Sequence, residues 1–182
     1  ALHRGAGRRQ RRGMQPGQCV GHAAQHRRAC ARRQHLAQRH PDGLRLLADV
    51  GATNARFALE SAPGRLWAAD VMPVERHASL ESAVRSFLEQ HGEPPVRHAA
   101  FSLANPITGD WVKLTNHDWE FSIEALRRSL KLQTLLVVND FTALAMALPR
   151  LQPSQRRAVG GGAPRERSVV GLLGSGTGLG VS

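Results

Sequence analysis

The feature that most restricts the fold is the way in which the apolar segments of this chain are connected. Three apolar segments, at 44–50, 54–60 and 65–74, follow one another with only short turns between them. From Ser79 onward, apolar runs of strand length alternate with segments of helical spacing. Strands joined by tight turns pair antiparallel, whereas strands separated by a helix pair in parallel. We therefore predict an α/β fold with a mixed sheet and helices on the faces of that sheet.

The helices are predicted from apolar spacing and from the residues at their ends. Between Leu80 and Leu88 apolar residues recur at helical intervals, with Ser79 as the N-cap and Gly92 as the stop. The other predicted helices lie at 123–130, capped by Ser122, and at 141–148, ending at Pro149. The remaining predicted strands lie at 96–104, 111–114, 133–139 and 169–173.

The positive charge of the chain is concentrated near its beginning. Ten arginines and one acidic residue, Asp42, give residues 1–43 a formal charge of +9, out of +11 for the whole chain. This segment lacks Ile, Phe, Trp and Ser and has no apolar period, so we expect a disordered basic tail. We interpret it as sequence that is not native to the protein, and expect its deletion to leave stability unchanged. A basic arm for nucleic acid is the alternative, but nucleic acid is not an expected partner.

Composition excludes several classes of protein. No apolar run approaches the ~20 residues of a membrane helix, and no apolar signal segment is present. Both cysteines, Cys19 and Cys30, lie in the tail, so a disulfide scaffold and a cysteine-based zinc site are excluded elsewhere. We therefore expect a cytoplasmic protein that makes no contact with a membrane.

The first candidate site is the segment Asp49–Asn54. It places a carboxylate at the end of an apolar strand, followed by Gly51 and the hydroxyl of Thr53. Glycine lets the backbone approach a phosphate, and Thr53 with nearby N–H groups can donate to it. Asp49 can hold Mg²⁺ directly or through water. A plain β-hairpin with an Asp turn is the alternative, because turns favour the same residues.

The second candidate is a glycine-rich segment, Gly174–Gly180, which contains Thr177 and follows an apolar run. Its spacing, Gly-x-Gly-x-Gly-x-Gly, fits neither the dinucleotide pattern nor the Walker A loop. A turn rich in glycine with a hydroxyl still suits a phosphate. A flexible loop is the alternative interpretation.

The third candidate is the pair Asn139–Asp140, which lies between a buried strand and a helix. Open α/β sheets bind ligands at the carboxyl ends of their strands. Asp140 there can act as a general base that accepts a proton from an alcohol. Helix capping is the alternative, because Asp is a good N-cap residue.

Two polar loops complete the set of candidates. Residues 105–110 and 115–119 combine Asn, Asp and His with neighbouring tryptophans. Such a combination is typical of sugar-binding loops and of ordinary loops alike. We interpret His117 as a loop residue rather than a ligand.

Together these segments resemble the bacterial glucokinase family, the ATP-dependent hexose kinases with the actin-like ATPase (ribonuclease H-like) fold. The resemblance runs from about Leu44 to Ser182 and leaves residues 1–43 unmatched. It departs from the family at Ala52, where glycine is usual and where alanine can serve if φ is negative. The five ordered motifs that carry it are 48–56, 106–112, 115–119, 139–143 and 174–181.

The resemblance implies a role for each matched residue. Asp140 would be the catalytic base, and Asn139 and Asp140 would bind glucose. Asp49 would hold Mg²⁺, through water. The ATP phosphates would be bound by two loops, made of Ala48, Asp49, Val50, Gly51, Ala52 and Thr53, and of Gly176, Thr177 and Gly178.

The resemblance also implies the reaction, which is transfer of the ATP γ-phosphoryl group to the 6-hydroxyl of D-glucose. The cofactors would be ATP and Mg²⁺, the partners glucose and ATP, and a homodimer is compatible with the family. Residues 44–150 would form the N-terminal small kinase domain, and 151–182 a linker and the start of a truncated larger domain. We expect this incomplete form to be inactive alone. The alternatives are an inactive fragment and a kinase-like, sugar-responsive transcription regulator, which would need a helix-turn-helix before the phosphate loop.

Overall fold

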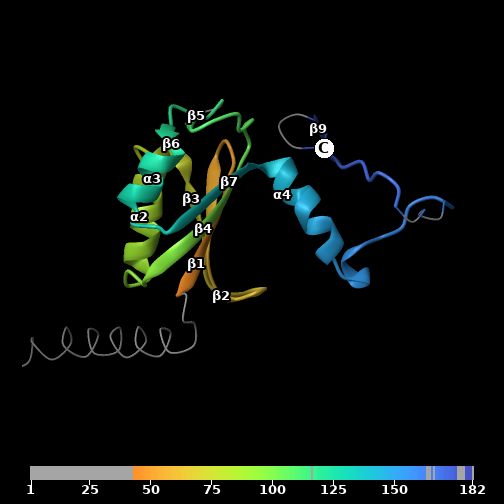
Figure 1. Cartoon of the computed structure of the whole chain (residues 1–182), viewed down its shortest axis with the longest axis horizontal. Helices are drawn as coiled ribbons and strands as arrows, with labels where there is room; N and C mark the ends of the chain where they lie inside the picture. Colours follow the sequence, from red (N-terminus) through yellow and green to blue (C-terminus); the bar gives the residue numbers. More distant parts are fainter. Residues whose placement is uncertain (1–42, 116, 163–164, 166, 176–178, 182) are drawn as a thin grey trace, which may run out of the picture.

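The computed structural model describes residues 43–115, 117–162, 165, 167–175 and 179–181. Its centre is a five-stranded sheet with the order β3-β2-β1-β4-β7 (Figure 1). The first three strands pair antiparallel, whereas β4 is parallel to both β1 and β7. The predicted mixed sheet is therefore confirmed, while the predicted tail lies outside the described residues except for Gly43. The strands are β1 (Leu44–Val50), β2 (Asn54–Ala62), β3 (Arg65–Pro73), β4 (Val96–Leu103) and β7 (Thr134–Asn139).

The parallel pairing decides where the candidate segments lie. Val50 at the end of β1 is opposite Leu103 of β4, and Leu103 is opposite Asn139 of β7. The carboxyl ends of parallel strands meet at one edge of a sheet. The connections after β1 and β4, and the start of α4 (Asp140–Ala147), therefore share this edge.

One face of the sheet is covered by α2 (Leu80–Gln90) and α3 (Ile123–Ser129), as Figure 1 shows. Alternate residues of β1 and β2 are buried against these helices, because successive side chains of a strand point to opposite faces. Phe57 of β2 stacks on Phe87 of α2, with 5.5 Å between the ring centroids. This layer forms the hydrophobic core of the molecule.

Both helices begin at the predicted serines. The hydroxyl of Ser79 accepts a hydrogen bond from Ser82 N at 3.1 Å, and the Ser82 hydroxyl accepts one from Ser79 N. The hydroxyl of Ser122 accepts from Ala125 N at 3.0 Å. These bonds satisfy amides that the first turn of a helix leaves free. The predicted helix starts are therefore confirmed.

A short sheet lies next to α3 and was only half predicted. It consists of β5 (Trp111–Lys113) and β6 (Glu120–Ser122), which pair antiparallel. β6 was missed because three residues are too few for an alternating pattern. Trp119, directly before β6, is 1% exposed and donates its indole N–H to the His77 carbonyl at 2.9 Å. The start of β6 is thereby anchored to the core.

Helix α4 leaves the sheet at β7 and lies on the opposite side from α2 and α3 (Figure 1). Its residues are apolar around most of its circumference, but none is fully buried. Leu144 and Met146 are 51% and 62% exposed. Helices that are apolar all round are normally covered by other elements. The short 3₁₀ turns η2 (Leu148–Arg150) and η3 (Pro153–Gln155) follow α4, while η1 (Val74–Arg76) follows β3.

The prediction of a strand at 169–173 is wrong. Val169 and Val170 have no regular structure and are 98% and 70% exposed. Only Leu173 belongs to a strand, β8 (Leu173–Ser175), which pairs with β9 (Leu179–Val181) rather than with the five-stranded sheet. An apolar run becomes a strand where a neighbouring strand and a covered face stabilise it. Residues 169–172 have neither within the described structure.

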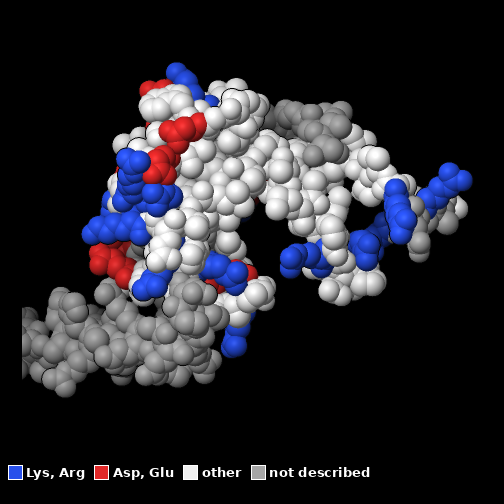
Figure 2. Space-filling model, in the orientation of Figure 1, with Lys and Arg blue, Asp and Glu red and all other residues white. Residues whose placement is uncertain are grey.

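The surface charges are unevenly distributed. Acidic and basic side chains are mixed over α2 and α3, whereas the described charged residues after α4 are all basic (Figure 2). These basic residues are Arg150, Arg156, Arg157, Arg165 and Arg167. Among the described residues, no helix combines the length and the apolar character that crossing a membrane requires.

The surface of α3 contains a compact ion-pair cluster. Glu124 accepts hydrogen bonds from Arg127 Nε at 2.7 Å and from Arg128 Nε at 2.8 Å. Hydrogen bonding to Arg127, and then to Arg128, lowers the pKa of Glu124 from 4.5 to about 2. The folded state therefore holds this carboxylate ionised at a pH where the unfolded chain protonates it.

This shift predicts a pH-dependent contribution to stability. Because the pKa of Glu124 is lower in the folded state, its contribution is complete above pH 4.5 and is lost as the pH falls towards about 2. In thermal melts over this range, Glu124→Gln should therefore lose less stability on acidification than the wild type. The control is Glu120→Gln. The Glu120 carboxylate lies 3.9 Å from its basic neighbour, Lys113 Nζ, and so lacks the two short hydrogen bonds that hold Glu124. An unchanged acid dependence in Glu124→Gln would contradict the assignment.

Candidate active site

The first predicted phosphate loop is the tight connection between β1 and β2. Gly51 N donates to Asn54 O at 3.0 Å, and Thr53 O accepts from Val74 N at 3.0 Å. Ala52 has no positive φ, so alanine introduces no left-handed backbone strain at this position. The side chain of Thr53 is exposed, and its hydroxyl has no hydrogen-bond partner among the described residues. The loop can therefore offer this hydroxyl to a ligand.

Burial limits what the other residues of this segment can contribute. The side chains of Ala48 and Val50 are 7% and 1% exposed and lie in the core. The two residues can therefore reach a ligand only through their backbone groups. The amide of Gly51 is already used inside the turn, and a Cβ at Gly51 would lie 3.4 Å from Asn54 O.

Asp49 lies on the face of β1 that points away from the core. Its Oδ2 accepts a hydrogen bond from Arg56 Nη1 at 3.0 Å, and its Oδ1 accepts one from Ser102 Oγ at 3.0 Å. Arg56 is opposite Asp49 in β2, and Ser102 is opposite Asp49 in β4. Each carboxylate oxygen is therefore held by a neighbouring strand. Neither contact can be read from the sequence, because only the strand register brings these residues together.

The donor set at Asp49 fits Mg²⁺ in a water-mediated role. No group of three or more His, Cys, Asp or Glu side chains that could hold a metal is found in the described part of the chain. Mg²⁺ retains several waters and is commonly bound through one or two carboxylates together with substrate phosphates. Asp49, half exposed and held at both oxygens, can accept hydrogen bonds from such waters.

Asn139, and not Asp140, caps α4. The Asn139 Oδ1 accepts hydrogen bonds from the amides of Phe141 at 3.0 Å and Thr142 at 3.4 Å. Its Nδ2 donates to the Asn105 carbonyl at 3.1 Å. Asp140 is the first residue of the helix, and its Oδ1 accepts from the Phe141 amide at 2.9 Å. Capping therefore accounts for Asn139 and leaves the second oxygen of Asp140 without a partner among the described residues.

Asn105, which follows β4, links this helix start to the β5–β6 segment. Its Oδ1 accepts from both the amide and the hydroxyl of Thr115, at 2.8 and 2.7 Å, and its Nδ2 donates to Lys113 O at 2.7 Å. Its own carbonyl accepts from Asn139. From the sequence alone, Asn105 is recognisable only as part of a polar loop. The residue fixes the positions of two loops at the carboxyl edge of the sheet.

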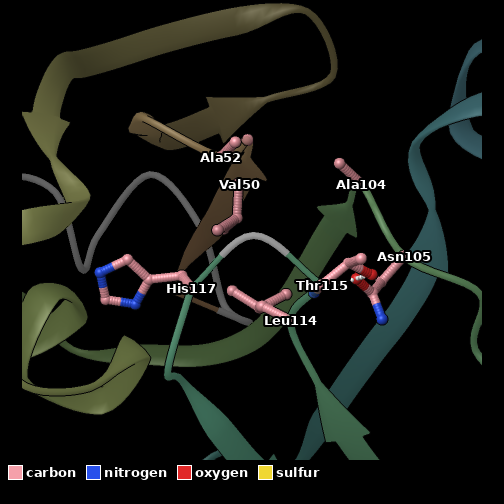
Figure 3. A pocket seen from close by; sticks show the side chains of 8 residues that line it. Val50, Ala52, Ala104, Asn105, Leu114, Thr115 and His117 are labelled. Atoms are coloured by element: carbon pink, nitrogen blue, oxygen red, sulfur yellow. Dashed lines mark hydrogen bonds between the residues drawn. The ribbon is translucent and has the colours of Figure 1, made fainter. Parts of the chain in front are cut away.

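A small cavity lies between Asn105 and the first loop (Figure 3). Asn105 and Thr115 lie at one end of it and His117 at the other, below Val50 and Ala52. Its volume is about 10 Å³, roughly the space of one water molecule. The buried Nδ1 of His117 has no hydrogen-bond partner among the described residues, and the His117 ring packs edge-on against Trp119 at 5.1 Å. The cavity is too small for a sugar, so it is not a substrate site.

The second glycine-rich segment reaches the start of α4. A Cβ added at Gly174 would lie 2.8 Å from Cζ of Phe141, which is too close for any side chain. Gly174 therefore lets β8 approach the residue that follows Asp140. Gly176, Thr177 and Gly178 lie outside the described residues, between β8 and β9.

Most of the described residues of the predicted site thus lie at the carboxyl edge of the five-stranded sheet. The Asp49–Thr53 segment, the Asn139–Asp140 pair and Gly174 come from three separate parts of the chain and lie around the ends of β1, β4 and β7. Ser102 and Arg56 join them as unpredicted neighbours of Asp49.

The cap at Asn139 can be tested independently of function. Asn139→Ala removes the acceptor for two amides and the donor to Asn105, and should lower the free energy of unfolding by about 1–2 kcal/mol. Asn139→Asp keeps the acceptor and should cost less. Urea denaturation followed by circular dichroism measures both variants. An equal loss in the two variants would show that the cap is not what stabilises α4.

Residues 46–182 match the family model named Glucokinase. The chain belongs to the glucokinase family. Among curated relatives, it is 59% identical to the Bifunctional protein glk of Burkholderia orbicola over 81% of this chain and 23% of that protein. It is 56% identical to the glucokinase of Chromobacterium violaceum over 76% of this chain and 40% of the relative. The chain therefore spans less than half the length of these relatives.

Solved structures agree with the fold. The glucokinase from an Antarctic psychrotroph superposes with a TM-score of 0.67 at 33% identity, over 76% of this chain and 45% of that one. A glucokinase of the ROK family from Streptomyces griseus, solved with glucose and AMPPNP, gives a TM-score of 0.53 at 20% identity, over 76% and 43%. The predicted family and fold class are thus confirmed.

Proposed function

We propose that this family member contributes to a glucokinase, which transfers the γ-phosphoryl group of ATP to the 6-hydroxyl of D-glucose. The observation that carries the proposal is the position of Asp140. This carboxylate begins α4 at the edge of the sheet where the Asp49–Thr53 segment and Gly174 also lie. Relatives named glucokinase, at 56% and 50% identity in Chromobacterium violaceum and Neisseria gonorrhoeae, support the choice of substrate.

In the proposed mechanism Asp140 is the general base. Its Oδ1 accepts the Phe141 amide, and its second oxygen would accept the proton of the attacking hydroxyl. Asn139 would assist in binding glucose. Its side-chain oxygen caps the helix, and one hydrogen of its side-chain amide is donated to the Asn105 carbonyl. The second hydrogen of that amide is therefore the group that Asn139 can offer to a sugar.

The phosphates of ATP would be bound at the two loops. The Thr53 hydroxyl and backbone amides of the first loop would donate to them, together with Gly176, Thr177 and Gly178 of the second. Asp49 would orient the water shell of Mg²⁺, which neutralises phosphate charge when it is bound. Phosphoryl transfer has a loose transition state, so positioning and charge neutralisation supply most of the catalysis.

The same proposal includes the organisation of the chain. Residues 44–150 would form the small domain, which is supported by a sheet and core that are complete by Asn139. Residues 151–182 would form a linker and the start of a larger domain. A cytoplasmic location and assembly as a homodimer also belong to the proposal.

The proposal can be tested with a chimera. Residues 44–182 would be joined to the remainder of the Chromobacterium violaceum glucokinase, of which the matched segment covers 40%. An assay coupled to glucose 6-phosphate dehydrogenase should detect ATP-dependent turnover with glucose. A folded chimera that binds Mg·ATP but does not phosphorylate glucose would contradict the substrate assignment.

A further inference from the structure

We propose that Arg56 is an exchangeable counter-ion, paired with Asp49 in the free protein and with a phosphate group when Mg·nucleotide is bound. This inference rests on the proposed function, because it assumes that a nucleotide phosphate binds beside Asp49. It assigns a role in ligand binding to Arg56. The carboxylate of Asp49 would thereby exchange its partner, the Arg56 guanidinium in the free state, for the water shell of Mg²⁺ in the bound state.

The geometry of the pair allows such an exchange. Arg56 contacts Asp49 through Nη1 alone. The other N–H groups of its guanidinium have no hydrogen-bond partner among the described residues. The side chains of Arg56 and Asp49 are 59% and 51% exposed. An exposed ion pair of this kind adds little to stability, so breaking it costs little. Arg56 can also bind a phosphate through two N–H groups at once.

Ser102 holds the Asp49 carboxylate in place during the exchange. Its hydroxyl holds the Oδ1 of Asp49 at 3.0 Å and is independent of Arg56, which holds Oδ2. When Arg56 leaves, the carboxylate therefore remains tethered to β4 by one oxygen. Oδ2 then becomes available to the water shell of a cation.

The charge of Arg56 gives opposite effects on two ligands. A free divalent cation at Asp49 is repelled by the nearby guanidinium. Mg·nucleotide carries a net negative charge and is attracted by it. Removal of the charge should therefore strengthen binding of the free cation and weaken binding of the nucleotide complex. A residue with only a structural role would not produce these opposite signs.

The chain contains a matched control. Arg45 pairs with Glu60 at 3.0 Å, again directly across β1 and β2. This pair lies at the other end of the same two strands, away from the loop. Arg45→Gln and Arg56→Gln therefore remove the same charge from two cross-strand pairs of the same two strands, of which the Arg45 pair is the more buried.

The experiment measures two affinities in the full chain. Electron paramagnetic resonance would follow Mn²⁺ binding, and calorimetry would follow Mg·AMPPNP binding. Arg56→Gln should strengthen Mn²⁺ binding about two- to fivefold, because a screened positive charge is removed. It should weaken Mg·AMPPNP binding about tenfold or more, because a charge-assisted hydrogen bond is lost. Arg56→Lys should keep the wild-type Mn²⁺ affinity and recover part of the nucleotide affinity, and Arg45→Gln should change neither.

Each outcome decides between the two proposals. If the wild type binds Mg·AMPPNP and Arg56→Gln behaves like Arg45→Gln, the role of Arg56 is refuted and the proposed function stands. If Arg56→Gln weakens both ligands to the same degree, Arg56 is structural and the inference is again refuted. If the folded wild-type chain binds no Mg·AMPPNP, the inference about Arg56 fails, whereas the proposed function is decided separately by the chimera.

Discussion

Asp140→Asn should lower kcat for glucose phosphorylation about a hundredfold or more, which is the usual contribution of a general base. The amide retains an oxygen that can accept the Phe141 N–H, so the start of α4 should be preserved. It has no free carboxylate oxygen to take the proton of the attacking hydroxyl. The KM for glucose should change much less than kcat, since only proton transfer is impaired. The measurement is the coupled assay on the chimera that carries residues 44–182.

The control for this variant is Glu89→Gln. Glu89 is an exposed carboxylate on α2, on the covered face of the sheet and remote from the carboxyl edge. The same change of carboxylate to amide there should leave kcat unchanged within about twofold, as surface substitutions usually have little effect. Near-normal turnover in Asp140→Asn would show that Asp140 is not the catalytic base. Its role at the start of α4 would then be structural only.

Trp119→Ala should lower the free energy of unfolding by about 3–5 kcal/mol, the usual cost of removing a large buried aromatic side chain. Trp119 is 1% exposed, packs in the core cluster and donates its indole N–H to His77 O. Its loss leaves a cavity and an unpaired carbonyl. The residue also anchors the segment that carries Thr115 and His117, so the support below the first loop should loosen.

The matched control is Trp111→Ala in the neighbouring strand. Trp111 is 63% exposed, so its replacement should change the free energy of unfolding by less than about 0.5 kcal/mol. Urea denaturation followed by circular dichroism at 222 nm avoids the loss of the fluorophore itself. Similar stabilities for the two variants would show that Trp119 does not anchor the start of β6 to the core.

The local features of the fold were determined by the sequence. The apolar run at 44–50 predicted a strand, which is β1, whereas the burial of alternate residues became evident only in the structure. Ser79 and Ser122 predicted the starts of α2 and α3, because a serine hydroxyl satisfies amides of the first turn whatever else surrounds the helix. These properties depend on neighbours within a few residues, so one chain is enough to predict them.

The partners of the site residues were decided by the tertiary structure. Ser102 reaches Asp49 across 53 positions of sequence, because β4 pairs with β1 in a particular register. Asn139 and Asp140 are both good caps, and the point where β7 leaves the sheet decides that Asn139 caps α4. The second oxygen of Asp140 is then left without a partner among the described residues. The apolar run at 169–173 shows the converse, because it has strand composition but no strand beside it. Composition sets what a segment can form, and contacts between distant segments select what it does form.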